Sequence, residues 1–314
     1  MELRELKYFL AVAQEGSISA AAEYLYMTQP SLSRQMQNLE KEVGGPLFER
    51  GSRRINLTER GLLLKKRAEE MLELYEKTVS EVSAPVAEVS GEVFIGGGES
   101  PALKSVIRAA MNVKNSHEKV KFHFFSGDAS SVLEKLDKGL IDFGILLDMH
   151  DLSQYNSLRL SHRDRWGVLV KNDDPLAQKS SISPDDLRGK TLITSDQALA
   201  KGMPVNWLGT PANEINVVAT YNLLYVGSQL TREGFGYALG LDGIINTEGT
   251  DITFVPLDPP VYNHADVIWK KFAVFSKPAQ LFLKELKNIC DQENKKVYIQ
   301  TAADAEIVRR PPFY

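Results

Sequence analysis

The residues of this chain with the clearest chemical capability lie between positions 28 and 37. Four apolar residues in and beyond this stretch recur at i, i+4, i+7 and i+11, namely Leu32, Met36, Leu39 and Val43. A helix with that spacing buries one apolar stripe and exposes a polar face. Arginine can pair bidentately with guanine, glutamine with adenine, and hydroxyl groups with phosphates or base edges. The face therefore predicts DNA contact through Thr28, Gln29, Pro30, Ser31, Ser33, Arg34 and Gln37.

The elements that must position this face form a predicted helix-turn-helix. Thr28 is the expected N-cap, and Pro30 falls in the first turn, where its missing N–H is harmless. Upstream, a helical stripe ends at Gly16, and Ser17 can cap a second helix before the turn. Two short helices joined by a tight turn let the second lie in the major groove. Gln29, Ser33 and Arg34 are the residues that we expect at base edges.

A basic hairpin is predicted after these helices. Short apolar runs at 47–48 and 55–57 flank a basic loop, which suits a two-stranded wing whose tip contacts phosphates. The expected phosphate contacts are Arg50, Arg53 and Arg54. Each element alone could be an ordinary solvated helix or surface hairpin. It is their order along the chain that predicts a winged helix-turn-helix.

Charge distribution agrees with DNA binding although the net charge does not. The formal net charge is −4, but residues 28–67 hold nine basic residues against four acidic ones. A phosphate-facing surface needs that local excess, and the sum over the whole chain matters less.

The same residues carry a family resemblance. Ala20-Ala21, Gln29 to Arg34, Leu39-Glu40, Pro46 to Arg50 and Leu57 to Gly61 resemble the N-terminal region of the LysR-type transcriptional regulators. The resemblance is dense over about the first sixty residues, and the total length fits too. It implies a homodimer, often a dimer of dimers, and a C-terminal effector domain. It does not imply which effector is bound.

A linker helix is predicted after the wing. Thr58 and Glu59 open a stretch without Pro or Gly from Leu62 to Ala84. Its apolar residues follow alternating steps of three and four: Leu64, Ala68, Met71, Tyr75, Val79 and Val82. Such a narrow seam favours pairing with another helix, and the alternative is packing on this chain's own second domain. Residues 85–90 are the expected hinge.

The rest of the chain predicts a two-lobed α/β domain. Strands are expected at 92–95, 120–125, 141–147, 166–170, 191–194, 215–219, 235–239 and 265–269, and helices at 101–114, 132–139, 184–187, 222–233 and 279–292. The tail after Asn294 is expected to be loose. The predicted fold class is thus α+β multidomain: winged helix-turn-helix 1–60, linker 61–90, and effector domain 91–314. Lobe I would span about 91–162 and 266–293, and lobe II about 163–265, resembling the periplasmic solute-binding proteins.

Chain crossings near 161–164 and 263–266 predict a cleft between the lobes, where small molecules bind. Ser100 is expected to cap a helix with Pro101 at its first position, which offers free N–H groups to a ligand. The remaining candidates are Ser126, Gly127, Asp128, Asp148, Thr194 and Ser195, and, from comparable family members, Val226 and Gly227. For the segments at 126–128, 194–196 and 226–228, ordinary turn or capping chemistry is the alternative, and mutual topology favours Ser100 and Thr194 as ligand contacts. Asp128 and Asp148 would oppose a dianionic ligand and favour a hydroxyl, amine or mixed one.

Other classes of chemistry find no motif. The five histidines show no ligand spacing, and neither nucleotide-binding glycine pattern nor catalytic signature occurs, so no metal, cofactor or catalytic residue is expected. Cys290 alone excludes an internal disulfide, and no apolar run reaches membrane length, so a cytoplasmic protein is expected. The expected partners are double-stranded promoter DNA, a small-molecule effector and further copies of the chain, with RNA polymerase as a further candidate. A solute-binding or enzymatic α/β protein with an incidental helical N-terminus is the competing class.

Overall fold

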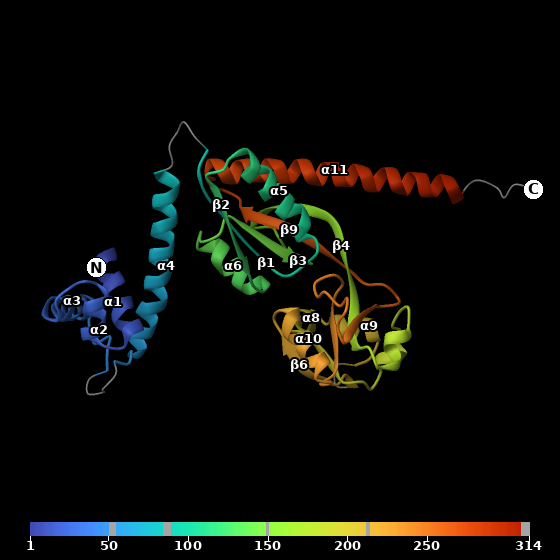
Figure 1. The fold of residues 1–314 in the computed structure, drawn as a ribbon, viewed down its shortest axis with the longest axis horizontal. Helices are drawn as coiled ribbons and strands as arrows, with labels where there is room; N and C mark the ends of the chain where they lie inside the picture. The colour runs from blue at the N-terminus through green and yellow to red at the C-terminus, as the bar shows by residue number, and fades with distance from the viewer. Residues whose placement is uncertain (50–54, 84–88, 149–150, 212–213, 309–314) are drawn as a thin grey trace, which may run out of the picture. The chain divides into compact units, whose positions relative to one another are not determined.

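The computed structural model describes residues 1–49, 55–83, 89–148, 151–211 and 214–308, without the side chains of 205 and 296–308 (Figure 1). The chain divides into two compact units, Met1–Ser83 and Ala84–Tyr314, and each is described by itself. The predicted wing tip with Arg50, Arg53 and Arg54 lies outside the described residues, as does most of the predicted hinge. Within the described ranges, no helix combines the length and the apolar composition that crossing a bilayer requires.

The described part of the first unit contains four helices: α1 (Leu3–Glu15), α2 (Ile18–Tyr24), α3 (Gln29–Glu42) and α4 (Glu59–Val82). Local signals set their ends. Gly16 ends α1 in the left-handed region with φ 67°, which glycine adopts without strain. The Ser17 hydroxyl then accepts a hydrogen bond from the Ala20 amide at 3.0 Å, so Ser17 caps α2 as predicted.

The core of this unit lies under α3. Phe9, Leu32 and Leu39 are fully buried, and they pack with further apolar residues of α1, α2 and α3. A bridge between Phe48 and Leu57 joins the two edges of the wing in antiparallel fashion. The Glu40 carboxylate at the end of α3 accepts hydrogen bonds from the amides of Leu47 (2.8 Å) and Phe48 (3.3 Å). Helix α3, called the recognition helix below, and the base of the predicted wing are therefore held in one packed unit.

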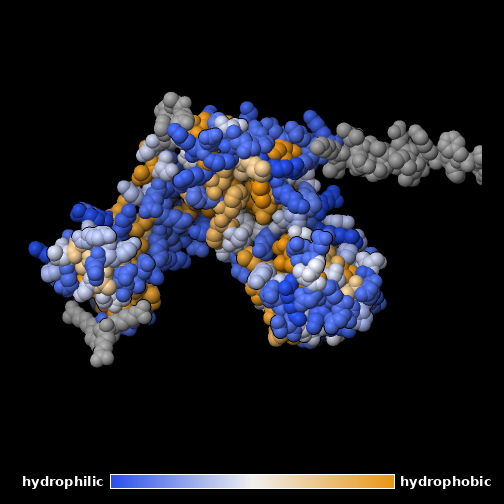
Figure 2. All heavy atoms as spheres, in the orientation of Figure 1, coloured by the Kyte–Doolittle hydropathy of each residue, from blue (hydrophilic) through white to orange (hydrophobic). Residues whose placement is uncertain are grey.

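The predicted seam of α4 is divided between two environments. Near its start, Ala68 and Leu72 are buried against Leu6 of α1, with Leu64 packed beside them. Toward its end, four seam residues are exposed: Met71, Tyr75, Val79 and Val82. Figure 2 shows hydrophobic residues along this helix. The first half of the seam thus serves the chain's own N-terminal unit, and the second half is left uncovered within it.

The second unit contains a continuous sheet whose strand order, among the described residues, is β2-β1-β3-β9-β4-β7-β5-β6, with β8 also paired to β4. The first lobe holds β1 (Gly91–Gly97), β2 (Val120–Ser126) and β3 (Phe143–Leu147), which pair in parallel. Two strands continue into the other lobe: β4 (Tyr155–Lys171) and β9 (Tyr262–Lys270). These two antiparallel strands connect the lobes (Figure 1).

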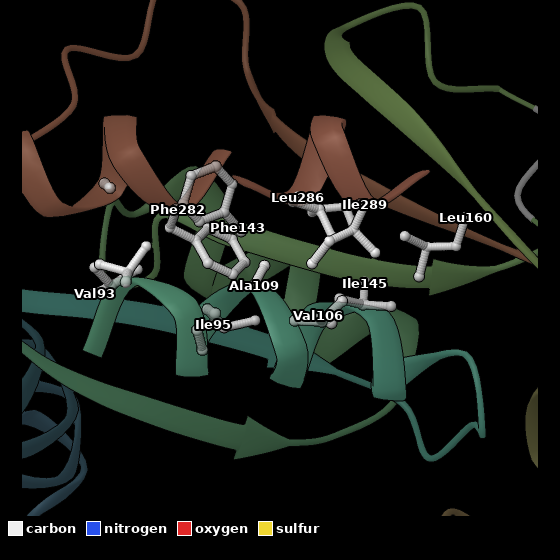
Figure 3. Packing of buried hydrophobic residues seen from close by; sticks show 14 of the residues in the cluster. Val93, Ile95, Val106, Ala109, Phe143, Ile145, Leu160, Phe282, Leu286 and Ile289 are labelled. Carbon is white, nitrogen blue, oxygen red and sulfur yellow. The ribbon is translucent and has the colours of Figure 1, made fainter. Parts of the chain in front are cut away.

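Helices α5 (Leu103–Ser116) and α11 (Lys277–Val308) cover one face of the first lobe, and α6 (Ala129–Asp137) packs against β3. Figure 3 shows Phe143 and Phe282 beside each other in the core, with Val106 and Ala109 of α5 opposite Leu286 and Ile289 of α11. All of these side chains are less than one-tenth exposed. The core therefore comes from segments at both ends of the unit's sequence.

The second lobe is built on the end of β4. Its other strands are β5 (Leu192–Ser195), β6 (Val217–Tyr221), β7 (Tyr237–Leu241) and β8 (Ile252–Pro256). Its helices are a 3-10 turn, η1 (Pro175–Gln178), and α7 (Pro184–Leu187), α8 (Asp196–Ala200), α9 (Met203–Leu208) and α10 (Leu224–Arg232). Apolar side chains such as Val168, Leu192 and Leu239 are buried in this lobe.

The structure corrects four expectations. β4 begins eleven residues before the predicted strand, because its first half is polar and pairs with β9 as an interlobe connection. The prediction missed β8, α8, α9 and η1 altogether. The helix predicted from Pro101 begins at Leu103, and the tail expected to be loose continues α11 to Val308. Residues 294–308 contain no Gly or Pro, so nothing in their sequence ends the helix.

Candidate functional site

The DNA-facing candidates lie together at the start of α3. Gln29, Pro30, Ser31, Arg34 and Gln37 are exposed, as is Thr28 before them, and Ser33 is half-buried. Thr28 occupies the N-cap position, but its side chain makes no capping hydrogen bond. Pro30 lies in the first turn as predicted. The polar face is thus presented to solvent above a sealed apolar core.

Arg34 has no ion-pair or hydrogen-bond partner among the described residues, and its side chain is exposed. Arg67 on α4, by contrast, pairs with Glu70 at 2.8 Å. An arginine that makes no contacts within its own unit keeps its planar array of N–H donors available for a base edge or phosphate.

Sequence reasoning missed Tyr26 in the turn before α3. Its side chain is 99% exposed, and its backbone has φ 54°, in the left-handed region that few non-glycine residues adopt. The amides of Tyr26 and Met27 close the end of α2 by bonding the carbonyls of Glu23 and Ala22. A fully exposed aromatic residue held beside the recognition helix is a further candidate for DNA contact. Only its position in a predicted turn could have drawn attention to it.

A cavity of about 520 Å³ opens between the two lobes of the second unit. Four predicted effector residues line it: Gly127, Asp128, Asp148 and Ser195. The predicted segments 96–101 and 194–196 also bring Glu99 and Asp196 to the lining. Residues that the prediction missed supply most of the rest, including Trp166, Gln197, Lys201, Trp207, Tyr221, Asn222, Leu224 and Asn263. The described lining therefore mixes aromatic faces with acidic and amide groups.

Six predicted effector residues lie outside this lining. Ser126 and Val226 are exposed elsewhere, Pro101 lies against Gly243, and Gly227 packs closely on the Tyr221 ring. Thr194 is fully buried, and its hydroxyl has no hydrogen-bond partner among the described residues. Ser100 is also buried, and its hydroxyl is hydrogen-bonded within the protein. Strand-end position alone did not determine which side chains face the cavity.

Ser100 instead binds the strand that joins the lobes. Its hydroxyl donates to Oδ2 of Asp164 on β4 at 2.5 Å and accepts from the Ala102 amide at 2.9 Å. Asp164 is 1% exposed, and Nε2 of His162 lies 3.4 Å from its Oδ1. Ser100 and Asp164 therefore fix the first lobe to β4 where that strand passes toward the second lobe.

Direct contacts also cross the cavity mouth. Lys201 of the second lobe donates from Nζ to the carbonyls of Leu147 (2.9 Å) and Asp148 (3.0 Å) in the first. Glu99 of the first lobe accepts at Oε2 from the Leu224 amide, at the start of α10, at 3.0 Å. Because each contact joins opposite walls, a movement of the lobes relative to each other would change them.

Burial raises the pKa of the Asp164 carboxyl above its ordinary value of 3.8, against opposing contributions from Ser100 and His162. A carboxyl whose pKa is raised on folding contributes most stability below the unfolded pKa and loses it as pH rises through the folded pKa. Asparagine does not titrate. We therefore expect the free energy of unfolding of Asp164→Asn to fall furthest below that of wild type near pH 3.5, and to fall less far below it, or to exceed it, near pH 7. Urea denaturation across that range measures the difference.

The exposed Asp185→Asn provides the control, because Asp185 pairs with Arg188 at the surface. Its difference from wild type should change less with pH. A constant difference for Asp164→Asn would contradict the raised pKa.

Comparisons with known proteins match both units of the chain. The family "Bacterial regulatory helix-turn-helix protein, lysR family" matches residues 3–62, and "LysR substrate binding domain" matches residues 87–291. The transcriptional regulator BsdA of Bacillus subtilis (strain 168) is 34% identical, over 90% of this chain and 99% of that protein. AlsR of the same organism is 32% identical, over 86% and 85%.

Solved structures agree on the fold. CbnR, a LysR family transcriptional regulator, matches with a TM-score of 0.75 at 21% identity, over 92% of this chain and 99% of that one. Full-length CbnR complexed with its target DNA matches with a TM-score of 0.74, also at 21% identity, over 92% and 100%. No cluster of three or more His, Cys, Asp or Glu side chains fit to hold a metal occurs in the parts of the chain that the structure describes. The chain belongs to the LysR family: it is a transcriptional regulator with a DNA-binding helix-turn-helix and an effector-binding domain.

Proposed function

We propose that two or four copies of this chain bind a near-palindromic promoter site through α3 and that a small molecule in the interlobe cavity regulates them. The observation that carries the proposal is the exposed polar face of α3, on which Arg34 has no partner among the residues that the structure describes. Gln29, Ser33 and Arg34 would contact base edges. Thr28, Ser31, Gln37 and Tyr26 would contact the backbone or flanking bases, with Arg50, Arg53 and Arg54 of the wing at phosphates.

The effector would act by binding two arrangements of the assembly with different affinities. A ligand can shift such an equilibrium only by that difference. The contacts of Lys201 and Glu99 across the cavity could produce this difference in affinity, because both contacts change if the lobes move. A change in lobe spacing would then alter how subunits are placed on the promoter and how they meet RNA polymerase. No catalytic residue, cofactor or metal enters this account.

The protein would act in the bacterial cytoplasm, where the promoter DNA is. The competing class, a solute-binding or enzymatic α/β protein with an incidental helical N-terminus, predicts no preference for any DNA sequence. That prediction separates the two at any salt concentration, because phosphate attraction alone does not distinguish sequences.

The dimer contact would be the exposed half of the α4 seam, from Met71 to Val82. Val79 is 44% exposed, and its neighbour in the seam, Tyr75, is also 44% exposed. We expect Val79→Glu to weaken dimerisation at least about tenfold, because burying an unpaired carboxylate costs more than ~1.4 kcal/mol. Sedimentation velocity over a concentration series measures this, and DNA affinity should fall with it.

Ser80→Glu is the matched control. It adds the same charge one residue away, outside the apolar seam, and should leave the dimer intact. If Val79→Glu sediments as the wild type does, α4 is not the dimer contact and the seam is covered in another way.

A further inference from the structure

We propose that the effector carries a cationic amino group on an aromatic or other flat apolar body, and that Glu99 sets this specificity. The inference rests on the proposed function of the cavity and adds the chemical class of its ligand. It depends on three observations: what occupies the start of α10, which charges line the cavity, and how its aromatic residues are held.

The start of α10 is already occupied by an anion. The Glu99 carboxylate accepts from the Leu224 amide at 3.0 Å, and Leu224 is the first residue of α10. The N-terminus of a helix is a favourable position for a negative charge. A ligand carboxylate that approached these amides would meet the Glu99 charge and would have to displace it. The chain thus fills from within the place where an anionic effector would bind.

The other charges that line the cavity also oppose an anion. Among the described lining residues, the carboxylates are Glu99, Asp128, Asp148 and Asp196, and Lys201 is the one cation. The Lys201 ammonium is directed to the carbonyls of Leu147 and Asp148, and burial lowers its pKa. Its charge is therefore already used to hold the lobes together. A bound cation would reduce the repulsion among the remaining carboxylates.

Two of these carboxylates can accept further hydrogen bonds from a ligand. Asp128 accepts at Oδ1 from the Ser131 amide, and Asp148 accepts at Oδ1 from the His264 amide, each at 2.8 Å. Hydrogen bonds from the side chain and then the amide of Ser131 lower the pKa of Asp128, so this carboxyl is ionised at neutral pH. Each carboxylate has more acceptor sites than these bonds use, and the second oxygen of Asp148 has no hydrogen-bond partner within the described ranges. An ammonium group has three donors that such oxygens can accept.

The apolar part of the ligand would meet three aromatic residues. Their polar atoms are already satisfied: Trp166 donates to Asn263 (2.7 Å), Trp207 to the Pro259 carbonyl (2.9 Å) and Tyr221 to the Leu239 carbonyl (2.6 Å). What they can add to the cavity is therefore apolar ring surface, which favours flat bodies and cations. A volume of about 520 Å³ is ample for a small aromatic ligand.

Tryptamine and indole-3-propionate test the inference, because they share an indole-ethyl body and carry opposite charges. We expect calorimetric titration of the full-length protein to give at least about tenfold tighter binding of tryptamine than of indole-3-propionate. The anion lacks the ion pair that the amine makes and is repelled by the carboxylates, and together these effects should exceed ~1.4 kcal/mol of binding free energy. In Glu99→Gln this ratio should fall at least about tenfold. The glutamine carbonyl can still accept from Leu224, so the fold is retained. Glu248→Gln removes an equal charge at an exposed residue outside the lining and should leave the ratio unchanged.

Tighter binding of indole-3-propionate, binding of neither compound, or an unchanged ratio in Glu99→Gln would overturn the inference. Fluorescence anisotropy with duplex DNA on the same samples separates this failure from failure of the proposed function. Sequence-specific DNA binding without amine binding would support the proposed regulatory function and contradict only the inferred class of ligand. Loss of sequence preference in the wild type would instead remove the proposed DNA-reading function.

Discussion

Arg34→Ala is expected to weaken binding to the preferred duplex by about 1–3 kcal/mol, or roughly 5- to 150-fold. The variant loses a bidentate base contact, and the loss should be much smaller on a scrambled duplex, where only phosphates are bound. Because Arg34 is exposed and has no partner in the described part of its unit, its removal should not destabilise that unit. Fluorescence anisotropy on both duplexes, with thermal unfolding of the protein alongside, measures the effect.

Arg188→Ala is the matched control for charge. Arg188 lies in the second unit and pairs at the surface with Asp185 at 3.2 Å, so its loss changes the net charge equally without touching α3. Binding of this variant should equal that of wild type. An equal loss on preferred and scrambled DNA for Arg34→Ala would show that Arg34 binds phosphate and does not read bases.

Phe143→Ala is expected to lower the free energy of unfolding of the second unit by about 3–5 kcal/mol. The Phe143 ring is fully buried, and the rings of Phe275 and Phe282 lie 4.8 and 5.0 Å from it between centroids. Removing the ring leaves a cavity that the surrounding elements cannot close, because β3, β9 and α11 pack against one another in this core. Figure 3 shows Phe143 beside Phe282 there. Such a loss is a large part of the ~5–15 kcal/mol that keeps a domain folded.

Urea denaturation followed by tryptophan fluorescence reports this change, since all three tryptophans lie in the second unit. Phe272→Ala is the control, because Phe272 is 94% exposed and should cost less than about 0.5 kcal/mol. Similar unfolding midpoints for the two variants would contradict the assignment of Phe143 to the core.

The DNA-binding fold was predictable because its signals are local. Gly16, Ser17 and the apolar spacing of α3 each act within a few residues, and the comparisons confirm the predicted family and fold class. The apolar seam of α4 was also predictable from local spacing. Its division into a buried part and an exposed part was not. Ala68 packs on α1, whereas Val79 is exposed. This difference depends on where α1 ends in space, and the spacing of apolar residues along α4 cannot specify that.

The effector cavity was less predictable, because its walls come from distant segments. Ser100 had the sequence of a helix cap, yet its hydroxyl is directed to Asp164, sixty-four residues away. Glu99, its neighbour, reaches Leu224 on the other side of the cavity. The first half of β4 is polar because it joins the lobes as a paired strand, so it lacked the apolar run that marked the other strands.

The central claim is that α3 reads a specific DNA sequence, and selection of duplexes from a random pool tests it most directly. Full-length wild-type protein should enrich an inverted repeat with half-sites about one helical turn, or a multiple of it, apart. Arg34→Ala should fail to enrich the same half-site. A wild-type pool that stays unenriched after repeated rounds, although the protein retains duplex DNA at low salt, would contradict the claim and leave only attraction to phosphates.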